Sequence, residues 1–508
     1  MYDMDSLGLN QKHLIGSVLR GQDLDDLLLE GINSNKEALI AHISRFDGQD
    51  LFQKWLKLLR CIDEFINMRF VLLPEEWDLI GQLNIDILHE QKSFVLLLTM
   101  IHSRFGDAVS ERIKVFILML ASMKLTYKKM NLPGIDFQNV KEAIDFCQSR
   151  RLYYVTYLSL IRIYAKGTEK IPFVELLCHF QYQIDFNMRS ITSALHSMLG
   201  NGCIDGYGAI VHDFGLEYNI PYNQLDSFFL EPHTMTEVDI LEHEESAKEQ
   251  YAAPLNPPKL YSYAELEKAV NQIEKLFEGY GINDSYVLSN AKCMVADLRG
   301  HFIEDYSIKL SENEFVSFSS KYPYLELCSK ATDYFEAINE RPAFFKNDGY
   351  YHSTVLLIIR YLENLVYEQL KRNRRYRIKA GFVFEKKVKV LLEQYGFIST
   401  EIKRIHQQEF DVICKKDGCA YNFQCKNNYL DINTLSPQNL DRVRKRNKRL
   451  VKYYIRALEK ENFRTKLVQE YFGVEHVENY VVARFPVVIN HERIIPFNKL
   501  ENWLIYNT

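Results

Sequence analysis

The sequence predicts a multidomain protein with a mostly α-helical N-terminal region and a C-terminal α/β domain built on a central mixed sheet. Three observations predict it: apolar residues at helical spacing over residues 1–230, a strand–turn–strand pattern around Asp417 and Gly418, and a change in charge near Lys371. The chain of 508 residues is long enough for roughly two to four domains with sizeable cores.

The composition is that of a globular protein, with 47% hydrophobic and 25% charged residues. Nine cysteines occur without a CxxC pair or a Cys/His metal spacing, which favours reduced thiols over a disulfide framework. No basic segment precedes an apolar run at the N-terminus, and the longest apolar runs are shorter than the roughly 18 residues that suggest a membrane span. We therefore expect a cytoplasmic protein with no membrane partner.

The first helical region covers residues 1–230, with segments such as LFQKWLKLLRCIDEFI and SERIKVFILMLASMK. Within it, residues 172–218 hold a helix ended by Gly200-Asn201-Gly202 and followed by a short hairpin-like stretch. This order fits a winged helix with Arg189 and Ser190 near the start of a recognition helix. The alternative is an ordinary helix with a glycine cap. We interpret His196 and His212 as surface or core residues rather than ligands.

Residues 231–260 are acidic and contain four prolines, which is typical of an exposed linker. An acidic mimic of nucleic acid is the alternative. Residues 261–370 are expected to form a helical connector domain, beginning with the amphipathic segment YAELEKAVNQIEKLFEGYG. A long helix over residues 351–373 would lead into the last domain.

The C-terminal domain, residues 371–508, is basic: it holds 28 Lys and Arg against 15 Asp and Glu, whereas the rest of the chain holds 34 against 52. Such asymmetry favours a polyanionic partner. Residues 371–379, KRNRRYRIK, and the predicted helix over residues 439–460 concentrate this charge, although a solvated helix face is the alternative. The candidate nucleic-acid contacts are Arg374, Arg375, Arg377, Arg442, Arg446, Arg449 and Arg456.

The stretch over residues 410–426, FDVICKKDGCAYNFQCK, predicts a β-hairpin because Asp-Gly favours a type I′ turn. A two-residue turn pairs Lys416 with Cys419 and places Asp411 opposite Gln424. Side chains alternate along a strand, so Gln424 and Lys426 share one face. An acid, an amide and a lysine would therefore meet on one patch. The same register would place Glu409 opposite Lys426, as an ion pair or a further acidic group.

This D-x(12)-Q-x-K arrangement resembles the active-site hairpin of the PD-(D/E)XK superfamily of restriction-endonuclease-like nucleases, in the Q-x-K form of Mrr-type enzymes. The family places a glutamate on the helix before the hairpin, and GFVFEKKVKVLLEQYGF supplies Glu385 there. The resemblance covers roughly the last quarter of the chain, from Ala380 to about Trp503. Two departures are Phe410, which replaces the family's proline, and Gln424, which removes a negative charge and would weaken metal affinity.

The resemblance implies a restriction-endonuclease-like fold, with one or two late strands and a closing helix. It also implies hydrolysis of phosphodiester bonds with Mg²⁺ or Mn²⁺. Asp411 would be the main metal ligand, with Glu385 binding directly or through water. Further ligands would be the Gln424 amide oxygen and the Cys425 carbonyl, and Lys426 would orient or deprotonate the attacking water. The implied catalytic residues are Glu385, Asp411, Gln424 and Lys426.

DNA is favoured over RNA because the resembling families mostly act on DNA. The helical N-terminal region would sense or bind a protein partner, and analogy suggests anti-phage defence and a homodimer. The rival interpretation is a non-catalytic nucleic-acid-binding or assembly subunit that retains the fold. The sequence contains no Walker A, HExxH or GxSxG motif, so any nucleotide dependence would come from a partner.

Overall fold

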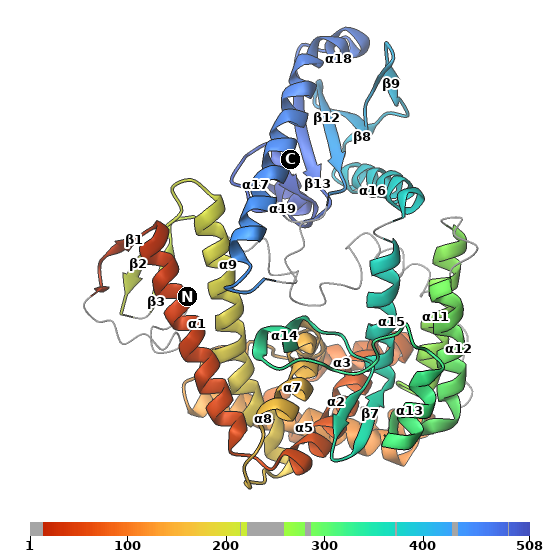
Figure 1. Cartoon of the computed structure of the whole chain (residues 1–508). Helices are drawn as coiled ribbons and strands as arrows, with labels where there is room; N and C mark the ends of the chain where they lie inside the picture. Colours follow the sequence, from red (N-terminus) through yellow and green to blue (C-terminus); the bar gives the residue numbers. More distant parts are fainter. Residues whose placement is uncertain are drawn as a thin grey trace.

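The computed structural model describes residues 14–213, 215–220, 259–279, 286–370, 373–428, 435–485 and 487–507. Nearly all of the predicted linker over residues 231–260 therefore lies outside the described residues. The molecule has a helical lower body and a C-terminal domain that sits above it (Figure 1). Among the helices described, none has both the length and the apolar character needed to cross a membrane.

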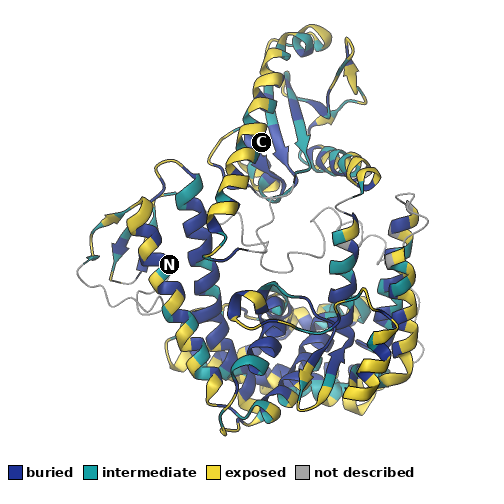
Figure 2. Ribbon diagram, in the orientation of Figure 1, coloured by how far each residue is buried: buried dark blue, intermediate teal, exposed yellow. Residues whose placement is uncertain are grey.

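The N-terminal region is helical, as predicted. Asp47 starts the second helix because its side chain accepts a hydrogen bond from the Asp50 amide at 2.8 Å. The helix α9 packs along α1 and is buried over most of its surface (Figure 2). The helices are α1 (Gly21–Ser44), α2 (Gly48–Val71), α3 (Pro74–Gln82), η2 (Ile85–Glu90), α4 (Lys92–Phe105), α5 (Asp107–Lys129), α6 (Val140–Ser149), α7 (Arg151–Tyr164), α8 (Phe173–Gln183), η3 (Ile184–Met188) and α9 (Arg189–Cys203).

A hairpin follows α9, as the winged-helix prediction requires. Its strands β2 (Ala209–His212) and β3 (Gly215–Tyr218) are antiparallel, and β1 (Val18–Leu19) adds a third strand. However, α8, η3 and α9 form one continuous helical stretch, because Met188 keeps a right-handed helical backbone. Ser190 lies inside that stretch and is 1% exposed, so it is buried by the fold rather than presented near the start of a helix, and the winged helix is not confirmed.

The two histidines of this segment are placed as interpreted. His196 is buried in α9, and burial lowers its pKa to about 3. His212 Nε2 lies 2.8 Å from Glu217 Oε2 across the hairpin. Both are explained by packing and pairing within the fold.

The predicted helical connector contains a sheet that the prediction missed. Its helices alternate with four antiparallel strands in the order β4-β5-β7-β6. The helix predicted from residue 351 begins only at residue 355, because residues 350–354 form a strand that pairs on both sides. The elements are α11 (Tyr263–Gly279), α12 (Tyr286–Leu298), η5 (Arg299–His301), β4 (Phe302–Ile303), β5 (Ser307–Ser311), α13 (Glu312–Ser320), α14 (Tyr334–Asn339), β6 (Phe345–Asn347), β7 (Tyr350–Thr354) and α15 (Val355–Leu370).

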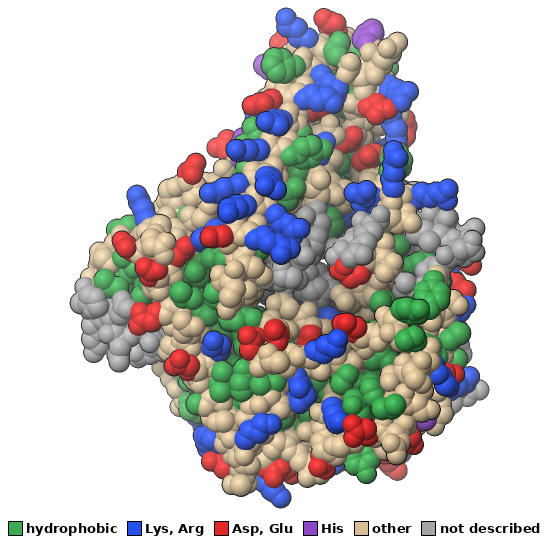
Figure 3. Space-filling model, viewed as in Figure 1, with side chains coloured by type: hydrophobic (Ala, Val, Ile, Leu, Met, Phe, Trp, Pro, Cys, Tyr) green, Lys and Arg blue, Asp and Glu red, His purple; other side chains and the backbone are tan. Residues whose placement is uncertain are grey.

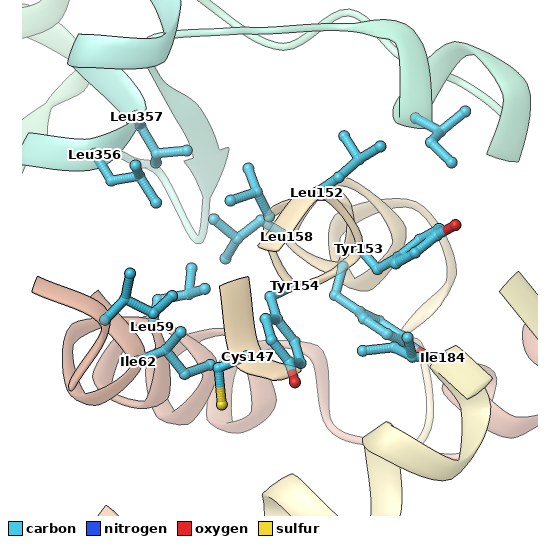
Figure 4. Close-up of a cluster of buried hydrophobic side chains, with 14 of the residues drawn as sticks. Leu59, Ile62, Cys147, Leu152, Tyr153, Tyr154, Leu158, Ile184, Leu356 and Leu357 are labelled. Carbon is cyan, nitrogen blue, oxygen red and sulfur yellow. The ribbon is translucent and has the colours of Figure 1, made fainter. Parts of the chain in front are cut away.

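The connector and the N-terminal helices share one hydrophobic core. Leu59 and Ile62 of α2, Tyr154 of α7 and Leu356 of α15 all belong to this core (Figure 4). A buried polar contact joins the same two parts, since Tyr306 donates a 2.7 Å hydrogen bond to a carboxylate of α2. The two regions therefore form one body beneath the C-terminal domain.

The C-terminal domain is an α/β domain with a five-stranded mixed sheet, as predicted. Its strand order is β14-β13-β12-β11-β8, and β12, β13 and β14 are parallel. The late strands and the closing helix are present as expected. The elements are α16 (Arg374–Gln394), β8 (Ile398–Ser399), β9 (Arg404–Ile405), β10 (Gln408–Glu409), β11 (Val412–Lys416), β12 (Cys419–Lys426), α17 (Leu440–Phe463), α18 (Thr465–Phe472), β13 (Val477–Ala483), β14 (Ile494–Pro496) and α19 (Phe497–Asn507).

Helices cover both faces of this sheet. Phe384 and Val388 of α16 pack with Phe423 of β12 and with α19 on one face. Tyr454 and Leu458 of α17 pack against β13 on the other face, where α18 also lies. The side chains of β12 alternate between these two layers, so its polar residues face α17.

The helix α17 also connects the C-terminal domain to the body, since its first turns lie against α9 (Figure 1). Arg444 Nη2 lies 2.6 Å from Asp25 Oδ2 of α1 and also donates to the Met198 carbonyl. A Cβ atom at Gly202 would lie 2.0 Å from Arg444 Nε, so a larger residue at position 202 would displace the Arg444 side chain. The two parts are joined by a specific, partly buried contact.

Candidate active site

The predicted hairpin register is confirmed: Lys416 pairs with Cys419 and Val412 pairs with Phe423. Asp417 and Gly418 have φ values of 50° and 80°, as a type I′ turn requires at both positions. Asp411 directly precedes β11, and Gln424 and Lys426 lie at the far end of β12. The turn thus sets which side chains meet at the other end of the hairpin.

Asp411 is held by two donors from β12. Its Oδ2 atom accepts a 2.8 Å hydrogen bond from the Cys425 backbone amide and a second hydrogen bond from Gln424 Nε2. Burial raises the pKa of Asp411, while the charge of Lys426 and these hydrogen bonds oppose that rise. The acid and the amide are therefore in direct contact, as the register predicted.

Glu385 reaches the same site from α16. The adjacent Phe384 and the following Val388 are fully buried and hold the helix against the sheet, while the Glu385 side chain remains 20% exposed. Burial raises the pKa of Glu385 to about 7, and the charge of Asp411 adds to this rise. Lys403 Nζ, 4.0 Å from Glu385 Oε2, opposes it. Two mutually repelling carboxyl groups therefore share one partly desolvated site.

Lys426 completes the group. It is partly buried, and burial lowers the pKa of its ammonium group, whereas the charges of Asp411 and Glu461 raise it. Its Nζ atom also lies 5.7 Å from the ring centroid of Tyr453 on α17, within cation–π range. The four predicted catalytic residues thus come together from α16, from the residue before β11 and from the end of β12.

Glu409 is placed differently from the prediction. It lies on β10, which pairs with β9 in a separate small hairpin, and it forms an exposed ion pair with Arg404. The chain leaves the β11 register before Asp411, because the Phe410 amide bonds to the Lys403 carbonyl at 3.0 Å. The predicted pairing of Glu409 with Lys426 is therefore wrong.

Glu461 is a site neighbour that the sequence reasoning missed. It is 1% exposed near the end of α17, and its Oε2 accepts a 3.0 Å hydrogen bond from Asn422 Nδ2. Its Oε1 lies 3.1 Å from Arg464 Nη1. The charge of Glu461 acts on both Asp411 and Lys426. The available signal was its spacing after Tyr454 and Leu458, which places a carboxylate in line with the buried stripe of the helix.

The donor set fits a hard divalent cation. Within the described residues no group of three or more His, Cys, Asp or Glu side chains could hold a metal ion. The acidic donors of the site are Asp411 and Glu385, since the nearby Glu461 is already bonded to Arg464 and Asn422. Mg²⁺ is commonly held by one or two carboxylates together with water and substrate phosphate. A Gln amide oxygen and a backbone carbonyl are compatible further donors. Burial is the main cause of the raised pKa of Glu385, and the charge of Asp411 adds to it; a cation bound between the two carboxyl groups would offset this second contribution.

The predicted nucleic-acid residues lie on two exposed helix surfaces. Arg374, Arg375 and Arg377 are exposed in the first turn of α16. Arg442, Arg446, Arg449 and Arg456 are exposed along α17. In Figure 3, Lys and Arg side chains follow the length of α17, and others gather near α16. One surface belongs to α16, which carries Glu385, and the other belongs to α17, which covers the candidate active site.

No family model, curated protein or solved structure matches this chain. Function is therefore inferred from the chemistry of these side chains and from their surroundings.

Proposed function

We propose that the C-terminal domain is a Mg²⁺- or Mn²⁺-dependent nuclease, with DNA favoured over RNA. The observation that carries this proposal is the convergence of Asp411, Glu385, Gln424 and Lys426 at one end of the β11–β12 hairpin. Each has a role in phosphodiester hydrolysis, and the electrostatic coupling of Glu385 with Asp411 is typical of functional sites. The order of helix, hairpin, helix and late strands agrees with the fold that the resemblance implies.

In this mechanism Asp411 is the fixed ligand, because two donors already orient it before any cation binds. Glu385 is a second, titratable ligand, and Gln424 contributes a neutral amide oxygen. When bound, the divalent cation would polarise the scissile phosphate and offset its negative charge. Lys426 orients the attacking water and takes up or shares its proton, which its lowered pKa favours.

The exposed arginines of α16 and α17 would bind the phosphate backbone on either side of this site. Their contribution is electrostatic, so binding should weaken steeply with salt. The helical body, joined to α17 through Arg444 and Asp25, is in a position to bind a protein partner or sense a signal and to transmit it to the domain.

The test is cleavage by the full-length protein of plasmid, single-stranded DNA and RNA with Mg²⁺ or Mn²⁺, beside Asp411→Ala and Lys426→Ala. Loss of cleavage in both variants, with nucleic-acid binding retained, would support the nuclease. Equal cleavage by all three proteins would overturn the assignment of the site. Binding without cleavage on every substrate would favour the rival function, a nucleic-acid-binding subunit that retains the fold.

A further inference from the structure

The exposed face of α17 carries aromatic residues among its basic residues. Tyr453 is 48% exposed and Phe463 is 90% exposed, although both are large apolar rings. Single exposed apolar residues are common on protein surfaces, so their exposure alone implies no ligand. What distinguishes these two rings is that they lie among the basic residues of α17.

The rings and the charges lie on one line of the helix. Successive spacings of three and four residues keep side chains on the same face, and this line, here named the aromatic–basic stripe, follows that rule over about 25 Å of helix. The buried residues Tyr454 and Leu458 belong to the side of the helix that faces the sheet. The members of the stripe, all exposed, are Arg446, Arg449, Tyr453, Arg456, Lys460 and Phe463.

The stripe meets the candidate active site at Tyr453. Lys426 Nζ lies 5.7 Å from the Tyr453 ring centroid, so the ring borders the site while nearly half of it stays open to solvent. The ring is also supported from beneath, since its centroid lies 5.9 Å from that of the buried Tyr454. Tyr453 is therefore a partly fixed aromatic platform beside the position proposed for the scissile phosphate.

We propose that the aromatic–basic stripe binds single-stranded nucleic acid, with an unpaired base stacked on Tyr453 next to the active site. Cations interspersed with aromatic rings suit a single strand, because cations track the phosphates while rings stack with exposed bases. In a duplex the bases are stacked on one another and an isolated surface ring cannot reach their faces. The binding of a single strand is inferred from the stripe itself, whereas the statement that the bound base lies next to the cleaved phosphate rests on the proposed nuclease function.

The test measures binding without cleavage. Full-length protein is titrated in EDTA against labelled oligothymidylate, oligouridylate and a DNA duplex with the same number of phosphates, using fluorescence anisotropy. Tyr453→Ala should weaken single-strand binding by about 5- to 150-fold, the effect of losing one stacked base. Duplex binding, which depends on charge, should change little. The thymidylate and uridylate arms separate a DNA ligand from an RNA ligand.

Two variants control this experiment. Tyr453→Phe keeps the ring and should retain binding to single strands. Tyr471 of α18 is similarly exposed, at 53%, but lies outside the stripe, so Tyr471→Ala should have no effect. Thermal unfolding of each variant checks that the fold is intact.

The outcomes separate the two proposals. If Tyr453→Ala weakens strand and duplex binding equally, or weakens neither, the single-strand inference is wrong even when the wild-type protein cleaves. If the stacking effect is found but no substrate is cut with Mn²⁺, the nuclease proposal fails and the binding inference stands. Absence of binding to every nucleic acid overturns both.

Discussion

The backbone amide of Cys425 donates a 2.8 Å hydrogen bond to Asp411 Oδ2, so the principal acidic group is held by the main chain of the neighbouring strand. A backbone donor cannot swing away as a side chain can. The position of Asp411 is therefore set by the hairpin itself, and a metal would enter a preorganised site. This arrangement leads to five predictions about the residues around Asp411.

Replacing Lys426 with methionine keeps the length of the side chain and removes its charge. We expect cleavage to fall by about 100- to 10,000-fold, the usual contribution of a positioned acid–base group. Mn²⁺ should bind more tightly, because a cation next to Asp411 has been removed. Single-turnover cleavage and calorimetric titration with Mn²⁺ measure the two effects. Weaker Mn²⁺ binding would place Lys426 in a structural role.

The raised pKa of Glu385 predicts that the stability of the protein depends on pH. Its folded-state pKa is raised to about 7, above the roughly 4.3 of an unfolded glutamate. The folded state therefore holds a proton that the unfolded state has lost, and stability should decrease as pH rises from about 4.5 to 7. Thermal unfolding in EDTA should show this slope, and Glu385→Gln should flatten it. An unchanged slope in the variant would assign the effect to other groups.

Ionisation of Glu385 should also affect catalysis, but in the opposite direction to its effect on stability. The ionised carboxylate is the metal ligand, so Mn²⁺ affinity and cleavage should rise with pH through about 7. Excess Mn²⁺ should shift this transition to lower pH, because the cation favours the ionised form. A transition that is independent of metal concentration would show that Glu385 is not a ligand.

Gln424→Glu tests the amide that distinguishes this site. Gln424 now donates to Asp411, whereas a glutamate there would place two carboxylates in contact. We expect a lower melting temperature in EDTA and tighter Mn²⁺ binding than in the wild-type protein. Melting curves with and without Mn²⁺ measure both. A metal affinity that stays unchanged would locate the cation away from residue 424.

Glu461 is expected to be required for the stability of the C-terminal domain. Glu461→Ala removes the buried carboxylate that Arg464 and Asn422 share, although each keeps a further hydrogen bond, to Gln408 and Asn479 respectively, and should cost about 3 kcal/mol. Glu459→Ala, an exposed change two residues earlier, is the matched control and should cost little. Chemical denaturation gives both free energies. Glu461→Gln, which keeps an acceptor, should recover part of the stability, and equal losses in the Ala and Gln variants would show that charge alone matters.

The site was predictable where it depends on local geometry. The Asp417–Gly418 turn determines the register over the whole hairpin. The contact of Asp411 with Gln424 therefore follows from the residues of the turn, which lie close to both in the sequence. Glu461 was missed because it meets β12 only through the packing of α17 on the sheet, which no local pattern specifies. Glu409 was misplaced because the register was extended past a point where the chain forms another hairpin.

The missed sheet of the connector has a different cause. Asp348 and Gly349 join β6 to β7 with φ values of 48° and 73°, the same turn chemistry that revealed the active-site hairpin. Here β7 runs directly into α15 without a breaking residue. The apolar residues that follow Thr354 have helical spacing, so the helix pattern masked the end of the strand.

The junction of Arg444 with Asp25 and Gly202 has a mechanical consequence. The helix α17 contacts the body through its first turns and carries Tyr453 and Glu461 farther along. A tilt of α9 would move the first turns of α17 and so shift Tyr453 and Glu461 relative to Lys426, without a hinge inside the sheet. A displacement of the body is thus transmitted to the candidate active site through a single helix.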